Sequence, residues 1–125
     1  MAERPSPSRT PEDIQKRTYR FALRVIKLAR AMPRDVAGSV LGRQVLRSGT
    51  RIGANCEEAK AAQSRADFVS KLSLSLKEAR ETLYWLRLVR DAELVRPTRV
   101  ANLVAESDEI VSILTSIVRK TKSRA

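Results

Sequence analysis

The sequence contains no histidine, a single cysteine and few aromatic residues. Without histidine, the chain lacks the commonest general base at neutral pH and the commonest metal ligand. Cys56 cannot form a disulfide within the chain, and its place near the apolar face of a predicted helix indicates a buried thiol rather than a nucleophile. Aromatic residues are 4% of the chain, too few for a surface that stacks nucleic-acid bases. We therefore expect no catalytic residues, no cofactor and no metal site.

Charge is strongly one-sided, with 25 Lys and Arg against 14 Asp and Glu and a net charge of +11 in 125 residues. This excess indicates an anionic partner, which can be nucleic acid, a membrane surface or an acidic protein. No apolar run approaches the ~18–20 residues of a membrane span, and residues 1–11 lack the apolar core of a signal peptide. We expect a cytoplasmic, single-domain protein that does not insert into membranes.

Hydrophobic periodicity predicts four amphipathic helices joined by short turns. They cover residues 11–32, 36–62, the stretch after Ser64 to about 91, and 97 to about 121. Asp35 and Ser64 are the candidate N-caps of the second and third helices, and no period-two strand pattern competes. We predict an all-α fold, an antiparallel up-down four-helix bundle over residues 11–121. Residues 1–10 would be a disordered arm and residues 122–125 a basic tail.

The first predicted helix carries basic residues and no acidic ones from residue 14 to residue 34. Lys16, Arg20, Arg24 and Lys27 follow the spacing i, i+4, i+8, i+11 and therefore share one face. Such a face can bind phosphates. The candidate nucleic-acid-binding residues are Lys16, Arg17, Arg20, Arg24, Lys27, Arg30, Arg119 and Lys120.

Simpler explanations compete with phosphate binding. The basic face can be solvated, or it can form inter-subunit ion pairs with an acidic cluster on the fourth helix, Glu106, Asp108 and Glu109. Cations at a helix C-terminus gain a few tenths of a kcal/mol from the helix dipole, which explains Arg119 and Lys120 equally well. The charge distribution on the assembled protein discriminates these explanations.

The second predicted helix has glycines on one flank and arginines on the other. Gly38, Gly42, Gly49 and Gly53 align on the first flank. A glycine inside a helix costs roughly 1 kcal/mol relative to alanine, so this alignment predicts that another helix packs very close there. The glycines match no phosphate-binding loop motif.

The third predicted helix has two apolar stripes. Its core stripe consists of Phe68, Leu72, Leu76, Ala79, Leu83, Leu86 and Arg90. A bundle helix needs one stripe, so the second, carrying Leu74, Trp85 and Leu88, predicts a subunit contact. Together with the glycine flank, this stripe predicts a ring-like homo-oligomer.

Two glutamates interrupt the second stripe. Glu78 and Glu81 could pair with Arg47 or Arg51 across the subunit interface. They also come nearest to a two-carboxylate catalytic site, but no histidine or organised pocket accompanies them. We therefore assign these four residues to the predicted oligomer interface.

Residues 41–88, LGRQVLRSGTRIGANCEEAKAAQSRADFVSKLSLSLKEARETLYWLRL, carry a family resemblance. The motifs are Leu-x-Arg-Ser-Gly-Thr-x-Ile-Gly-Ala-Asn, Glu57-Glu58, the junction at residues 64–68, Lys77-Glu78-Ala79-Arg80-Glu81 and Tyr84-Trp85-Leu86. They resemble the signature of the bacterial 23S rRNA-intervening-sequence proteins, a family of small four-helix bundles. The match spans roughly residues 14–118.

That family is similar in fold to the accessory variability determinant of diversity-generating retroelements, a basic homopentamer that binds nucleic acid and a reverse transcriptase. The resemblance implies a pentamer of this chain. It also implies a non-enzymatic accessory protein that binds RNA or DNA and docks a reverse transcriptase or another ribonucleoprotein. The alternative is a structural protein–protein interaction hub without a nucleic-acid role.

Overall fold

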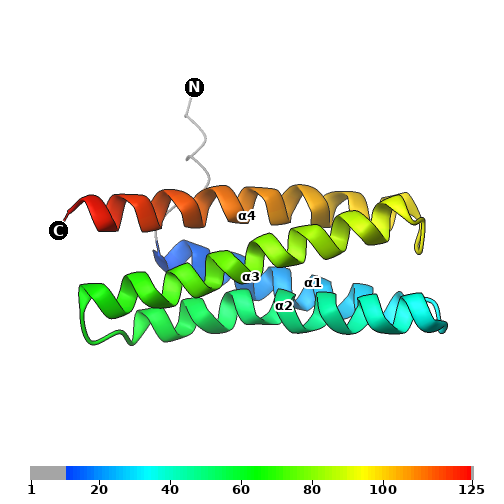
Figure 1. Cartoon of the computed structure of the whole chain (residues 1–125), viewed down its shortest axis with the longest axis horizontal. Coiled ribbons are helices and arrows are strands. Elements are labelled where there is room, and N and C mark those ends of the chain that lie inside the picture. Colours follow the sequence, from blue (N-terminus) through cyan, green and yellow to red (C-terminus); the bar gives the residue numbers. More distant parts are fainter. Residues whose placement is uncertain (1–10, 125) are drawn as a thin grey trace, which may run out of the picture.

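A computed structural model describes residues 11–124 and consists of four long α-helices packed along one another (Figure 1). The helices are α1 (Pro11–Ala31), α2 (Val36–Lys60), α3 (Arg65–Asp91) and α4 (Pro97–Ser123). The turns after α1 and α3 lie at one end of the bundle and the turn after α2 at the other, while α1 contacts both α2 and α4. The predicted all-α four-helix bundle is confirmed, and no strand occurs within residues 11–124.

The helix ends differ from the predicted ones by at most two residues. The last helix continues to Ser123, so the first two residues of the predicted basic tail belong to α4. The predicted disordered arm, residues 1–10, and the last residue of the tail lie outside the described residues.

Both predicted N-caps are present. The Asp35 side chain accepts a hydrogen bond from the Gly38 backbone N–H at 2.8 Å. The Ser64 hydroxyl accepts one from the Asp67 N–H at 3.0 Å, and the Asp67 carboxylate accepts one from the Gln63 N–H at 3.3 Å. The Asp35 and Ser64 side chains satisfy backbone donors that the first turn of a helix leaves free, and the Asp67 carboxylate binds the residue before the cap. The residues at which the second and third helices begin are therefore determined by local sequence.

Sequence periodicity also predicts core stripes for the first and last helices. The first stripe is Ile14, Thr18, Phe21, Val25, Leu28 and Met32, and all six are buried, but Ile26, which the pattern predicts to widen it, is 39% exposed. The last stripe is Val100, Leu103, Ser107, Ile110, Leu114 and Ile117, and all six are buried. On α3 the stripe ends at Val89 rather than at Arg90, because the last step from Leu86 is three residues and not four. The prediction for Arg90 is wrong: its side chain is exposed and pairs with Asp91 at 2.8 Å.

The glycine flank of α2 faces α1. A Cβ atom on Gly49 would lie 2.8 Å from Val25 Cγ1, and one on Gly53 would lie 3.3 Å from Thr18 Oγ1. These distances leave little or no room for a side chain, so the predicted close helix packing is confirmed. The neighbour is a helix of the same chain, and the flank therefore gives no support to a subunit contact.

Small polar side chains join α2 to α3 inside the core. The Thr82 hydroxyl donates to the Ser48 hydroxyl at 2.8 Å, and the Ser75 hydroxyl donates to the Ile52 carbonyl at 2.8 Å. The Cys56 sulfur lies 3.3 Å from the Ser75 hydroxyl, and burial raises the pKa of the thiol. A buried thiol with a raised pKa is a poor nucleophile, as the sequence predicts.

Alanine at Gly49 should destabilise the fold, because its Cβ would press on the buried Val25 side chain at 2.8 Å. We expect Gly49→Ala to lower the free energy of unfolding by about 1–2 kcal/mol, after the gain in helix propensity. Gly42→Ala is the matched control: its Cβ would meet Met32 Cγ at an ordinary 3.5 Å. It should raise the free energy by up to about 1 kcal/mol. Urea denaturation followed by circular dichroism measures both, and equal effects would contradict the close packing.

Candidate nucleic-acid interface

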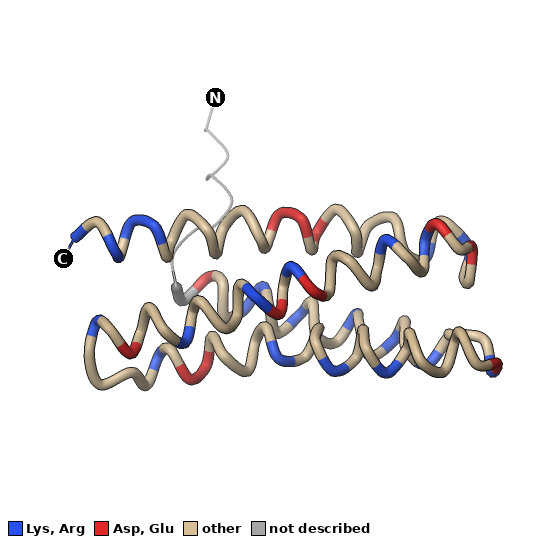
Figure 2. The backbone as a smooth tube through the Cα atoms, in the orientation of Figure 1, with Lys and Arg blue, Asp and Glu red and all other residues tan. Residues whose placement is uncertain are grey.

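Four cations line one side of α1. Lys16, Arg20, Arg24 and Lys27 are all exposed, and none forms a hydrogen bond or ion pair with another residue of the 11–124 segment. Figure 2 shows Lys and Arg spread along α1 and α2, whereas the Asp and Glu of α4 gather near its middle. We call these four residues the basic face.

Part of the basic face borders a groove between α1 and α4. The groove has a volume of about 380 Å³. Its lining includes Lys16, Arg17, Arg20 and Arg24, together with the carboxylates of Asp13 and Glu106. Cations therefore outnumber carboxylates in the groove, and an anion that enters it meets several positive side chains at once.

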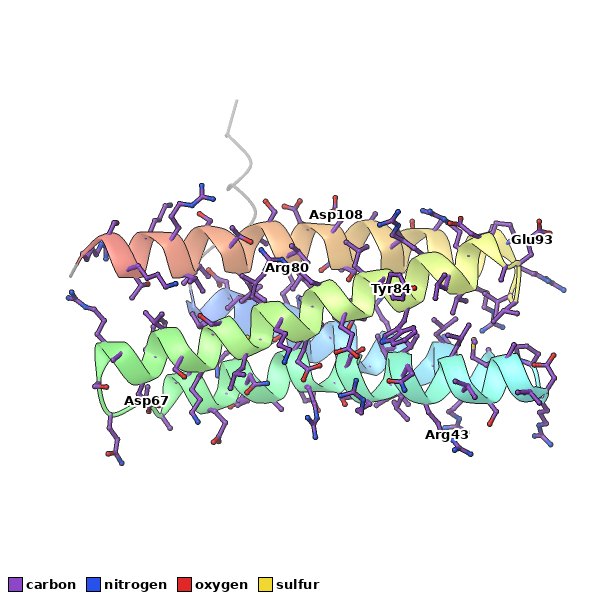
Figure 3. All side chains as sticks on the ribbon, in the orientation of Figure 1. Arg43, Asp67, Arg80, Tyr84, Glu93 and Asp108 are labelled. Carbon is purple, nitrogen blue, oxygen red and sulfur yellow. The ribbon has the colours of Figure 1, made fainter. Side chains whose placement is uncertain are left out.

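Arg17 lies at the inner edge of this groove and pairs with α4. Its Nε and Nη2 atoms donate to the two Glu106 carboxylate oxygens at 2.6 and 2.8 Å, with both side chains about four-fifths buried. This hydrogen bonding raises the pKa of Arg17 against the opposing effect of burial. Arg17 is one of the predicted nucleic-acid-binding residues, and its guanidinium group is already paired with Glu106 of the same chain. Asp108 points away from the bundle (Figure 3).

The remaining predicted binding residues lie elsewhere. Arg30 is exposed in the last turn of α1, where it lines a different hollow beside the turn into α2. Arg119 and Lys120 are exposed near the C-terminal end of α4. The structure therefore gathers four of the eight predicted residues on one unpartnered face and leaves three apart from it.

The predicted pairing of arginines with glutamates occurs, but within one chain. Arg47 Nη2 lies 2.6 Å from Glu81 Oε1, and Arg51 Nη1 lies 3.8 Å from Glu78 Oε2. Both pairs join α2 to α3, so the prediction that they bridge two subunits is not needed to explain them. Trp85 donates from Nε1 to the same Glu81 oxygen at 3.3 Å.

The second apolar stripe of α3 is only partly open to solvent. Trp85 is half-buried and packs against the core, and Leu88 is also half-buried. Leu74 is 45% exposed, and the neighbouring Tyr84, labelled in Figure 3, is 54% exposed. Tyr84 also contacts Trp85 edge to face, with ring centroids 5.2 Å apart. An apolar surface therefore remains on α3 after the bundle has formed.

Sequence reasoning offered Glu106 as an ion-pair partner of the first helix, but between subunits, and it identified neither Arg17 as the partner nor the groove that the pair borders. Periodicity places Arg17 beside the core stripe of α1, which is a signal for contact with a neighbouring helix, but it does not identify that helix. Within the described segment, no three His, Cys, Asp or Glu side chains gather as a metal site would require. None of its helices is both long enough and apolar enough to cross a membrane.

Comparisons with known proteins agree with the sequence motifs. The model of the family described as 23S rRNA-intervening sequence protein matches residues 12–116. A crystal structure of a protein of unknown function, from the S23 ribosomal protein family of Bacteroides thetaiotaomicron, is 39% identical. The similarity covers 87% of this chain and 97% of that one, with a TM-score of 0.80. No curated protein matches. The chain therefore belongs to the family of 23S rRNA-intervening sequence proteins.

Proposed function

We propose that this protein is a non-enzymatic accessory protein that binds RNA or DNA through the phosphate backbone. One observation carries the proposal: the four cations of the basic face share one side of α1, are exposed, and have no internal partner within residues 11–124. An ordinary solvated helix gains stability by mixing charges at i and i+4, and α1 forgoes this gain along most of its length.

The chemistry of the face favours backbone contacts over base contacts. Successive members from Lys16 to Arg24 are four residues apart, which is about 6 Å along a helix. Lysine and arginine bind phosphates at such spacings and release condensed counterions. Two aromatic residues flank this row: Phe21 is buried, whereas Tyr19 is 64% exposed and lines a hollow with Lys16 and Arg20. A single exposed ring does not make a platform on which successive bases stack. Recognition would therefore depend on charge and shape.

A structural interaction hub is the second candidate, and the Arg17–Glu106 pair favours it. This pair shows that acidic residues of α4 can neutralise cations of α1. Within the described residues of the single chain, the four cations of the basic face form no such pair with α4. The hub gains support only if a second subunit supplies the missing carboxylates.

We further propose that the bundle has antiparallel up-down topology and assembles into a ring-like homo-oligomer. The residual apolar surface of α3, which includes Leu74 and Tyr84, supports a subunit contact. The subunit number, five, is taken from the resemblance to the accessory variability determinant. A ring would repeat the basic face around its circumference. It could then dock a reverse transcriptase or another ribonucleoprotein.

Removing part of the basic face should weaken nucleic-acid binding. We expect the triple substitution Arg20→Ala, Arg24→Ala and Lys27→Ala to reduce affinity for a duplex and to flatten its salt dependence, because each lost phosphate contact removes about one unit from the slope. Fluorescence anisotropy at several salt concentrations measures both quantities. The control removes three exposed cations from α3, Lys77→Ala, Arg80→Ala and Arg87→Ala, and keeps the same net charge. Equal losses in both triple variants would contradict the proposed interface.

A charge placed on the apolar surface of α3 should disturb assembly. We expect Leu74→Arg to shift the protein to smaller species with its helicity retained, because Leu74 is 45% exposed in the single chain. Leu23→Arg is the control, since Leu23 is 53% exposed on α1. Light scattering after size exclusion gives the masses, and circular dichroism gives the helicity. An unchanged mass for Leu74→Arg would remove α3 from the interface.

A further inference from the structure

A second, larger hollow lies beside the turn that joins α1 to α2, at the end of the bundle where α1 finishes. It has a volume of about 880 Å³. Its apolar lining includes Met32 and Pro33 from the turn after α1 and Val36, Val40 and Leu46 from α2. We call this hollow the turn groove. Neither the family match nor the proposed nucleic-acid binding explains it.

Three apolar side chains of the turn groove remain exposed to solvent although the four helices are packed. Val36 is 82% exposed, Val40 52% and Leu46 37%. Two buried glycines of α2, Gly38 and Gly42, belong to its lining. A Cβ atom on Gly38 would collide with the Pro33 carbonyl, and one on Gly42 would meet Met32 Cγ at 3.5 Å, so these glycines let the turn pack closely on α2. An apolar surface of this kind at a concave site is typical of a binding site rather than of a solvated surface.

The rim of the turn groove is positively charged. Arg30, Arg34 and Arg43 line it, and all three are exposed. The carboxylate that lies among them, Asp35, caps α2 through the Gly38 N–H at 2.8 Å. None of the three guanidinium groups pairs with a carboxylate of residues 11–124. The groove therefore offers apolar contacts in its centre and unpaired arginine side chains around its rim.

We propose that the turn groove binds an acidic amphipathic segment of a partner protein. Apolar side chains of the segment would pack on the exposed Val36 and Val40. Its carboxylates would pair with Arg34 and Arg43, whose guanidinium groups suit carboxylates in a two-pronged geometry. A nucleic-acid backbone would satisfy the arginines but would bring no apolar groups to Val36 and Val40. A small amphiphile would leave most of its surface in water, because the groove is open along one side.

The test uses the full-length protein and a labelled synthetic peptide of about 15 residues, with leucines on one helical face and glutamates on the other. A second peptide of the same composition has its leucines dispersed around the helix. Val40→Glu places a carboxylate in the groove, and Leu23→Glu is a control with the same charge change and a nearly equal exposed fraction, 53% against 52%. Anisotropy gives the affinities, and light scattering gives the mass of each variant.

We expect saturable binding of the amphipathic peptide, weakened about tenfold or more by Val40→Glu and less than about twofold by Leu23→Glu. Equal binding of the dispersed peptide would show non-specific charge attraction and overturn the proposal. A changed mass of Val40→Glu alone would make the groove an interface between copies of this chain, which also overturns it. The proposal would also be overturned if the protein bound phosphatidylserine vesicles in preference to the peptide and Val40→Glu weakened that binding to the same extent. The peptide affinities test the turn groove independently of the proposed nucleic-acid binding, so either proposal can fail without the other.

Discussion

Gly49 and Gly53 let α2 lie directly against Val25 and Thr18 of α1, with little or no space for intervening side-chain atoms. Each glycine costs helix stability, and the dispersion contacts of two helices in close approach offset that cost. This approach fixes the register and rotation of α1 against α2. The outer side of α1 then carries the basic face, and the end of the helix pair forms the turn groove.

Charge is distributed over the bundle according to whether a neighbouring helix supplies a partner. Between α2 and α3, Arg47 and Arg51 face Glu81 and Glu78. The Arg47–Glu81 pair is partly exposed and contributes little stability by itself, whereas the Glu78 side chain is only 13% exposed. Between α1 and α4, one pair forms at Arg17. The basic face, which does not include Arg17, has no carboxylate partner within the described residues, and we propose that an outside anion is its partner.

Local sequence was sufficient to predict the four helices, the caps at Asp35 and Ser64, and most of the core. Each depends on periodicity or on a side chain three residues from its partner. The sequence could not show which helix supplies a partner, so the Arg47 and Arg51 pairs were placed between subunits although both lie within one chain. It also missed the turn groove, because that hollow depends on how α1 and α2 meet.

Binding of the purified full-length protein to a labelled structured RNA and a labelled DNA duplex, at about 50 and 200 mM salt, most directly tests the proposed function. Four phosphate contacts should cost about a hundredfold in affinity for a duplex across that range, with measurable binding remaining at the higher salt. A stronger affinity for one of the two would identify the type of nucleic acid. No binding at the lower salt, despite a net charge of +11, would contradict the proposal and favour the interaction hub.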